Sequence, residues 1–427
     1  MKDFCAFKLL DRFQKASNSR LNFRKTKVYG FGEWENRVNW PINDLKVEMD
    51  YFTTLGITFS CKYEIAIDKT WQMILNKIKN RIPLIRDRYF TLYQKSVIVN
   101  SLLSSKIWYA AHVYPLPFKF SKLINKELFG YIWKYNYDPI KRDVLCNPKI
   151  NGGIGIINVF CKAKSIFTAT VIKRLVNSNE NDLIKYYMAL RVNTLFGIRA
   201  LPNKVCLINT PYYEYSIDTI RKSYHIKNFP NIGSKDIYKM LIVITQPEIE
   251  KLYPNYDWKS IWKNVLFKPI NIYDRSIIFK YIHEILPNRK RLYEMRLKFS
   301  PLCNQCGVEE SNVHLVLYCQ KVQNCINWLK KLNFYLCHID IGNDLLKCFF
   351  LDFPKVTKAT QNTLCIIICS YISCVWYNRE EADLSVIKFK AKLIQGQKSH
   401  MLIYKDKTKF MFTKNYCKMR LDILNYL

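Results

Sequence analysis

Acidic residues are scarce in this sequence of 427 residues, which has 34 Asp and Glu against 67 Lys and Arg and therefore a formal net charge of +33. Such an excess disfavours cationic partners and favours a polyanion, because phosphates release condensed counterions when they bind lysine and arginine. Solubility alone and attraction to an anionic membrane surface are the alternatives. Aromatic residues make up 15% of the chain, and their rings can stack on bases, so we expect nucleic acid as the partner.

Long hydrophobic runs are also missing. The longest uncharged apolar stretch, residues 364–377, has 14 residues, which is short for a membrane span and typical of a buried core helix. No secretory signal is recognisable, and the odd total of 15 cysteines argues against a disulfide framework. We therefore expect a folded protein of the nucleus or cytoplasm with no membrane interaction.

One set of cysteines stands apart because it lies among polar turn residues. Cys303, Cys306, His314 and Cys319 are separated by two, seven and four residues, which is a ligand spacing typical of one tetrahedral zinc ion. The first pair can hold the metal from a tight turn, and the other two can approach it from the first turns of a following helix. Chance clustering in a cysteine-rich chain is the alternative. Four protein ligands predict structural rather than catalytic zinc.

The remaining chain is mainly helical in pattern. Residues 51–59 alternate in polarity and predict a hairpin, with a glycine where another group approaches closely. Residues 68–135 predict three helices, separated at Pro83 and at Pro115 and Pro117. The second helix has a stripe formed by Tyr89, Leu92, Ser96, Val99, Leu103 and Ile107. The glycines of residues 152–155 permit a sharp turn and close backbone approach, but their spacing excludes a dinucleotide-binding loop.

Three groups of motifs follow one another in a specific order. The first comprises Phe13, Ala16, Ser17, Leu21, Asn22, Lys25, Thr26, Lys27, Leu55 and Gly56. The second comprises Arg88, Lys95, Asn100, Ser101, Leu102, Lys106, Ile107, Tyr109, Phe129, Trp133, Pro139, Arg142, Leu145, Lys149 and Gly152. The third comprises Trp258, Trp262, Leu286, Pro287, Arg289, Arg291 and the four metal ligands. Together they resemble the C-terminal part of a non-LTR (LINE-type) retrotransposon reverse transcriptase, an RNA-directed DNA polymerase.

The resemblance implies a domain order. We expect a mainly α protein with a small β element at the N-terminus (α+β), in which a helical thumb is followed by a Cys-Cys-His-Cys zinc-binding module in a helical C-terminal domain. The expected parts are a palm remnant with the primer-grip hairpin (1–61), the thumb with its Gly-rich connection (62–175), a connector of unassigned fold (176–250), a helical region with the zinc module (251–385) and a basic tail (386–427).

The sequence departs from the family where the chemistry takes place. In the family, a strand carboxylate and a paired aspartate turn hold two Mg²⁺ ions over the primer end, and neither is recognisable here. We therefore expect no polymerase activity from this chain alone, and Mg²⁺ only in an intact parent enzyme. The expected function is to hold nucleic acid during target-primed reverse transcription. A repurposed, non-enzymatic nucleic-acid-binding zinc protein is the alternative.

The resemblance also implies which residues contact nucleic acid. The expected ligands are template–primer duplex, retrotransposon RNA and target DNA, bound through phosphates and A-form shape. The residues expected to contact them are Lys25, Lys27, Leu55, Gly56, Arg88, Lys95, Lys106, Arg142 and Lys149. For any single cation among them, a solvated charged helix face is the alternative.

Overall fold

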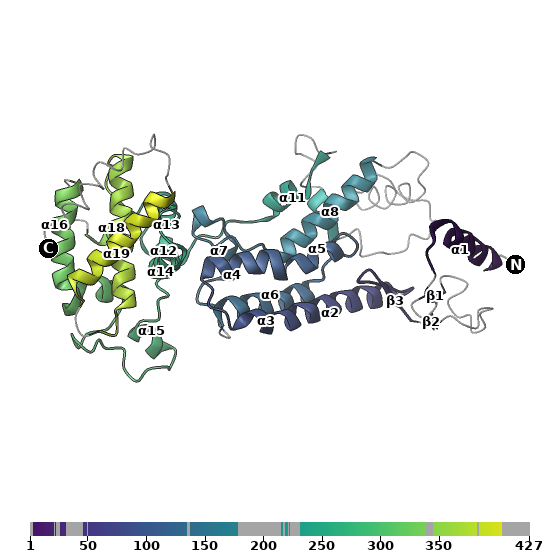
Figure 1. Cartoon of the computed structure of the whole chain (residues 1–427), viewed down its shortest axis with the longest axis horizontal. Coiled ribbons are helices and arrows are strands. Elements are labelled where there is room, and N and C mark those ends of the chain that lie inside the picture. The colour runs from purple at the N-terminus through teal and green to yellow at the C-terminus, as the bar shows by residue number, and fades with distance from the viewer. Residues whose placement is uncertain are drawn as a thin grey trace. The chain divides into compact units, whose positions relative to one another are not determined.

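The computed structural model describes residues 3–20, 22, 26–30, 46–48, 50–134, 137–177, 215–216, 218–220, 222, 231–337, 345–381 and 384–403. These residues form mainly helices, with small pairs of strands near the N-terminus (Figure 1). The expected mainly α fold with a small β element is therefore confirmed. The chain divides into two compact units, the first made of Met1–Ile85, Leu103–Glu127 and Val159–Leu241, the second of Arg86–Leu102, Leu128–Asn158 and Ile242–Leu427.

The first unit contains the strands. Its elements are α1 (Asp3–Ser17), β1 (Lys27–Tyr29), β2 (Lys46–Glu48), β3 (Phe52–Thr54), β4 (Ile57–Phe59), α2 (Tyr63–Arg81), most of α3 (Pro83–Arg86), α5 (Ser105–Ala111), the first part of α6 (Phe118–Trp133), α8 (Val159–Asn177) and α11 (Ser234–Leu241). Strands β1 and β2 are parallel, and β3 and β4 are antiparallel. Most of the connector expected at residues 176–250 lies outside the described residues.

The antiparallel pair is the hairpin predicted from the alternating sequence. Leu55 and Gly56 form its turn with φ angles of 50° and 80°, and this left-handed backbone matches the twist of a tight hairpin. The expectation that Gly56 marks a close approach is wrong, since an added Cβ would lie 3.6 Å from the Lys77 Nζ, an ordinary contact. Gly56 instead supplies the positive φ that a side chain disfavours.

Helix α2 forms the centre of the first unit because its apolar residues recur at helical spacing. Its buried residues are Ala66, Ile67, Thr70, Trp71, Ile74, Leu75 and Ile78. The Trp71 indole donates to the Pro115 carbonyl at 2.9 Å, and the Thr70 hydroxyl accepts from the Thr58 N–H at 3.0 Å. The bond from Thr58 fixes the hairpin against the helix, the bond to Pro115 fixes the segment before α6, and both satisfy buried polar groups. As predicted, α2 ends before Pro83, which begins the short α3.

The second unit contains the remaining helices. Its elements are α4 (Leu92–Ile98), most of the π-helical turn η2 (Val99–Leu103), the end of α6, α7 (Arg142–Cys146), η3 (Lys149–Asn151), α12 (Glu248–Leu252), α13 (Trp258–Val265), α14 (Ile272–Ile282), α15 (Arg289–Glu294), η5 (His314–Tyr318), η6 (Gln320–Val322), α16 (Gln323–Cys337), α17 (Leu345–Phe349), α18 (Lys358–Tyr377) and α19 (Val386–Ile403).

Helix α18 is the core of the second unit. It contains the predicted apolar stretch of residues 364–377, and Leu364, Ile368 and Ile372 are all fully buried. A helix that is apolar on every side must be surrounded by others, and α14, α16 and α19 pack on it (Figure 1). Helix α19 occupies the start of the segment expected to be a tail. Among the described residues, no helix is both long and apolar enough to cross a membrane.

Helix α4 has a well-defined beginning. The Thr91 hydroxyl accepts from the Gln94 N–H at 3.3 Å, and the Gln94 side chain accepts from the Thr91 N–H at 2.9 Å, which forms a capping box. Tyr89 precedes this cap and is 94% exposed. The prediction that Tyr89 belongs to the stripe of the second helix is therefore wrong. The spacing of apolar residues continues to Tyr89, but the helix itself begins only at Leu92.

The Gly-rich turn after α7 does require close approach. A Cβ added to Gly153 would lie 2.1 Å from the Asn147 carbonyl oxygen. Gly152 has a φ of 76°, and its added Cβ would lie 2.8 Å from the Trp262 ring. The predicted sharp turn and close backbone approach are confirmed at these two positions.

Candidate metal centre

The first two cysteines of the predicted metal set lie on a tight turn. The Cys303 N–H donates to the Val308 carbonyl at 2.7 Å, and the Gly307 N–H donates to the Cys303 carbonyl at 3.0 Å. Gly307 has a φ of 66°, a left-handed conformation that glycine adopts without steric cost. The turn therefore presents both thiols to the same point, as the two-residue spacing predicted.

The other two ligands are joined by one π-helical turn, η5. The Cys319 N–H donates to the His314 carbonyl at 2.7 Å, so the hydrogen bond spans five residues rather than four. The sequence predicted an ordinary helical turn here. The wider turn lets Cys319 leave the helix in an extended conformation while it stays bonded to His314.

The four side chains converge on one point. Their ligand atoms all lie within 4.8 Å of one another. The Cys319 Sγ lies 3.8 Å from the Sγ atoms of both Cys303 and Cys306. A disulfide needs about 2.05 Å, whereas two sulfurs about 2.3 Å from one tetrahedral zinc ion lie about 3.8 Å apart. The group can therefore hold a metal ion, and its sulfur spacing suits tetrahedral thiolate coordination.

The protonation of these groups also fits metal binding. Burial lowers the pKa of His314, which favours the neutral imidazole that can act as a ligand. The His314 Nε2 is buried and has no hydrogen-bond partner among the described residues. A buried polar atom left without a partner is costly, and coordination of a metal would satisfy it.

Main-chain N–H groups surround the thiols. Although burial opposes it, hydrogen bonds from the main chain at Gln305 and Cys306 lower the pKa of the Cys303 thiol. The Gln320 N–H lies 3.2 Å from the Cys306 Sγ. Burial raises the pKa of Cys319 to about 12, and a bound cation would offset this by stabilising the thiolate. The donor set is therefore suited to soft cations such as Zn²⁺.

The metal group is anchored to the helical core of the second unit. The Tyr371 hydroxyl on α18 donates to the Val316 carbonyl in η5 at 2.9 Å. The Gln323 side chain at the start of α16 donates to the Leu317 and Cys319 carbonyls at 2.9 and 3.2 Å. These bonds use the carbonyls that the irregular turn leaves free, so the ligands are placed by the core as well as by their own loop.

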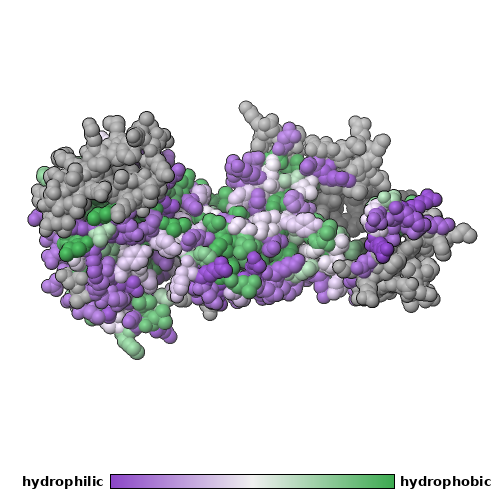
Figure 2. All heavy atoms as spheres, in the orientation of Figure 1, coloured by the Kyte–Doolittle hydropathy of each residue, from purple (hydrophilic) through white to green (hydrophobic). Residues whose placement is uncertain are grey.

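The segments that flank the ligands combine exposed aromatic and basic side chains. Phe299 is fully exposed, and Tyr318 and Tyr293 are 64% and 49% exposed. Arg296 and Lys298 are exposed and have no ion pair recorded among the described residues. Figure 2 shows hydrophobic and hydrophilic residues next to each other at the surface around α15. These aromatic residues were not predicted from the sequence, since pattern alone does not reveal their exposure.

Eight of the nine residues expected to contact nucleic acid are described, and Lys25 lies outside the described residues. Lys27, Leu55, Gly56 and Lys106 belong to the first unit, and Arg88, Lys95, Arg142 and Lys149 to the second. Six of them are accessible at the surface: Gly56 is partly exposed, and the other five are exposed, namely Lys27, Leu55, Arg88, Lys106 and Lys149. The Lys149 ammonium lies over the Tyr93 ring at 5.4 Å from its centroid, within the limit of about 6 Å for a cation–π contact.

Two of the expected contact residues are engaged within the protein. Lys95 is 8% exposed, and its ammonium donates to the Ile132 carbonyl at 2.5 Å. Lys95 therefore does not lie on an open surface as a duplex-contacting lysine would. The reason is visible in the sequence, since Lys95 follows Leu92 by three residues and shares its buried face. Arg142 forms an ion pair with Asp138 at 2.7 Å.

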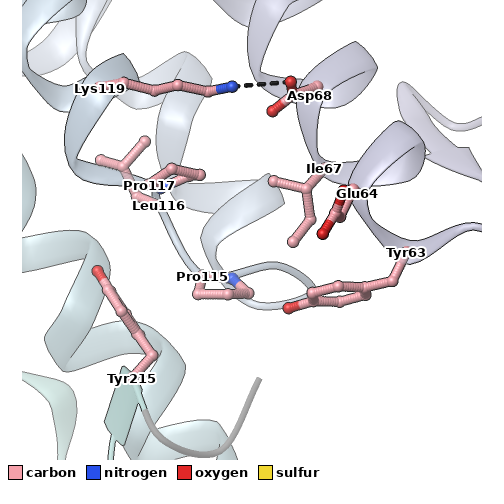
Figure 3. Close-up of a pocket in the computed structure, with 9 residues that line it drawn as sticks. All are labelled: Tyr63, Glu64, Ile67, Asp68, Pro115, Leu116, Pro117, Lys119 and Tyr215. Carbon is pink, nitrogen blue, oxygen red and sulfur yellow. Dashed lines mark hydrogen bonds and ion pairs between the residues drawn. The ribbon is translucent and has the colours of Figure 1, made fainter. Parts of the chain in front are cut away.

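A cavity of about 330 Å³ lies in the first unit, beside the start of α2 (Figure 3). Glu64 and Asp68 line it from α2, and Tyr215 lines it from the opposite side. Its one lysine, Lys119, forms an ion pair with Asp68 at 2.7 Å. Acidic groups therefore neutralise or exceed the positive charge in this cavity, which makes it a poor site for anions.

Known proteins provide no assignment for this chain. No protein-family model matches the sequence, and no curated protein is detectably similar to it. The function must therefore be argued from the metal group and the surfaces around it.

Proposed function

We propose that this chain binds single-stranded or unpaired nucleic acid with the surface formed by residues 289–318, and that a structural zinc ion holds this surface in shape. The observation that carries the proposal is the combination of exposed aromatic rings with two exposed cations, Arg296 and Lys298, that form no ion pair among the described residues. Aromatic rings stack on bases, and cations contact the phosphates between them.

The zinc ion has a structural role in this proposal. Cys303, Cys306, His314 and Cys319 supply four soft ligands, so no coordination position is left for a substrate or an activated water. The turn and the π-helical segment are short, and their four ligands converge on one point. Structural zinc contributes on the order of 10 kcal/mol to the folding of small modules, which is enough to fix the neighbouring surface.

The motif order supports a more specific proposal, in which this nucleic-acid grip is the C-terminal part of a LINE-type reverse transcriptase. The thumb and zinc-binding module would then hold template, primer or target strands, while Mg²⁺ and the polymerase carboxylates would come from other parts of the parent enzyme. Primer extension with Mg²⁺ by this chain alone is expected to give no product, and robust extension would show that the chain carries polymerase carboxylates of its own.

The test of the binding surface is fluorescence anisotropy with a labelled single-stranded RNA and the zinc-loaded full chain. Loss of one stacked base–ring contact costs about 1–3 kcal/mol, so Phe299→Ala should weaken binding by about 5- to 150-fold. Tyr318→Ala should act in the same direction. Phe334 is similarly apolar and 62% exposed on α16, so Phe334→Ala is the matched control and should leave the affinity unchanged.

Two readouts separate loss of the surface from loss of folding. Zinc content and thermal stability should be the same in Phe299→Ala and the unmodified chain, because the Phe299 ring contributes little to packing. Equal weakening by Phe299→Ala and Phe334→Ala, or no weakening by either, would show that RNA binds elsewhere.

A further inference from the structure

A second cavity lies within the second unit and has a volume of about 260 Å³. Four cationic side chains line it from different elements: Lys95 on α4, Lys134 directly after α6, Lys280 on α14 and Arg291 on α15. None of its described lining residues is an aspartate or glutamate. The cavity is therefore strongly electropositive, in contrast to the cavity of the first unit.

The positive groups of this cavity repel one another. Burial, together with the nearby charges of Lys134 and Lys280, lowers the pKa of Lys95 to about 8. Burial also lowers the pKa of Lys280. Lys95 is buried, Lys280 is partly buried and Lys134 is exposed. Holding a buried ammonium group close to other cations destabilises a protein unless an anion offsets the charge. Their shared location thus calls for a negatively charged partner.

The protein itself supplies no such partner among the described residues. Lys95 donates to the main-chain carbonyl of Ile132, which is a neutral acceptor. The nearest buried carboxylate on α14, that of Asp274, forms an ion pair with Lys392 at 3.0 Å. None of the described ion pairs includes one of the four cavity cations, so their charge is left for a ligand.

Arg291 is likewise not neutralised by an ion pair among the described residues. Its Nη1 donates to the main-chain carbonyl of Glu284 at 3.2 Å, which orients the guanidinium without neutralising it. The Glu284 carboxyl interacts with Lys290 instead. A guanidinium that uses one N–H in a hydrogen bond can still bind an oxyanion through its remaining N–H donors.

We propose that this cavity binds the phosphate group of a nucleotide, either free or at the end of a nucleic-acid strand. A terminal phosphate carries one to two negative charges and three acceptor oxygens, so it can be shared by several ammonium groups and a guanidinium. Two aromatic residues, Trp133 and Tyr137, also line the cavity, and aromatic rings are the groups on which bases stack. The volume of about 260 Å³ is close to the lower end of the range for small-ligand sites, which is roughly 300 Å³, and it is too small for a continuous strand.

Polar groups beside the cations favour a ligand with further acceptors. The Trp133 indole N–H is buried and has no hydrogen-bond partner among the described residues. Ser276 lines the same cavity, and its hydroxyl oxygen accepts from the Leu92 N–H at 3.4 Å, which leaves its own hydrogen free to donate. Sugar and phosphate oxygens are suitable acceptors for such donors.

The experiment is isothermal titration of the zinc-loaded full chain with adenosine 5′-monophosphate, adenosine and inorganic phosphate. The nucleotide should bind at one site, adenosine should bind much more weakly, and inorganic phosphate should compete. Hydrogen bonds between charged groups contribute about 1.5–3 kcal/mol, so Lys280→Met should weaken nucleotide binding by at least about tenfold. Lys259 is exposed on α13, so Lys259→Met is the matched control and should leave binding unchanged.

Competition with oligonucleotides identifies the source of the phosphate. If a strand with a 5′-phosphate displaces the bound nucleotide and the same strand with a 5′-hydroxyl does not, the site receives strand ends. If neither displaces it, the site receives free nucleotides, which also agrees with the proposal. The absence of nucleotide and phosphate binding, or equal binding by Lys280→Met and the unmodified chain, would overturn it.

This inference does not depend on the function proposed for the zinc-bound surface. Phe299→Ala should leave nucleotide affinity unchanged, and Lys280→Met should leave single-stranded RNA binding through residues 289–318 in place. Circular dichroism and zinc content of Lys280→Met show whether the variant is folded. If it is not, Lys280→Arg, which keeps the charge, should retain binding within about threefold, since Arg also binds phosphate.

Discussion

At the scale of single residues, Lys95 shows how a buried charge can be tolerated for a purpose other than stability. It is held between α4 and the end of α6 by one bond to a carbonyl, and the neighbouring charges of Lys134 and Lys280 oppose it. Residues that lower stability in this way are often found at binding sites, where a ligand supplies the missing interaction. Replacing Lys95 should therefore change both the stability of the free protein and its affinity for an anion.

Replacing Lys95 with methionine should stabilise the free protein near neutral pH. Burial lowers the folded-state pKa of Lys95 to about 8 from its ordinary value of 10.5. The unfolded chain therefore binds more protons between these two values, and the stability of the unmodified protein rises with pH across this window. Below about pH 8 the destabilisation is fully present, and Lys95→Met should remove about 1–2 kcal/mol of it.

The measurement is the melting temperature of Lys95→Met and of the unmodified chain at several pH values from 7 to 10. The variant should melt higher at pH 7, and the difference should shrink as the pH approaches 10. Lys259→Met, at an exposed position, should show no such trend. A variant that melts lower at pH 7 would mean that the carbonyl hydrogen bond outweighs the charge repulsion.

The same residue shows what sequence reasoning can and cannot provide. Lys95 lies three residues after Leu92 and four before Val99, so the apolar periodicity already placed it on the buried face of α4. The charge of Lys95 and the family resemblance both predicted a surface contact, whereas its position on the helix predicts burial. The convergence with Lys280 and Arg291 was out of reach, because it depends on how α14 and α15 pack against α4 within the second unit.

At the scale of elements, the metal-binding segment combines a predictable part with an unpredictable one. The spacing of Cys303 and Cys306 was sufficient to predict a tight turn, since two residues between ligands allow little else. The π-helical turn between His314 and Cys319 was not predictable, because its five-residue hydrogen bond is stabilised by Tyr371 and Gln323 from other helices. Local pattern identified the ligands, whereas packing determined the backbone that carries them.

Cys306→Ser should release zinc and loosen residues 300–325. The hydroxyl of serine is a poor zinc ligand compared with a thiolate, and the segment loses the constraint that the metal provides. Metal analysis should find less than one zinc per chain, and hydrogen exchange should accelerate in this segment while α18 stays protected. Cys61, a partly buried cysteine of the first unit, provides the control variant Cys61→Ser, which should keep its zinc.

A second variant tests whether coordination rather than packing is responsible. His314→Cys preserves four soft ligands and should retain zinc, because four thiolates also form a tetrahedral site. The absence of zinc from the unmodified chain, or equal exchange in Cys306→Ser and the unmodified chain, would contradict a metal-held module.

At the scale of the whole molecule, the net charge of +33 is the property that most strongly shapes association. Exposed ion pairs such as Lys119–Asp68 neutralise single lysines but leave a large positive excess. Such an excess accelerates encounter with polyanions and gives affinity with little sequence preference. In the function proposed above, discrimination would come from local features, which are the aromatic rings near the metal group and the cation-lined cavity.

Salt separates these contributions. Each phosphate contact that is neutralised on a single strand adds about −0.7 to the slope of log affinity against log salt concentration, so RNA binding by the full chain should weaken steeply between about 50 and 200 mM salt. Lys298→Gln should reduce the slope by about 0.7, the value of one contact. Phe299→Ala should lower affinity at every salt concentration with the slope unchanged, because stacking releases few ions. Anisotropy titrations at four salt concentrations measure both quantities, and a flat salt response of the unmodified chain would exclude a phosphate-binding role for its cations.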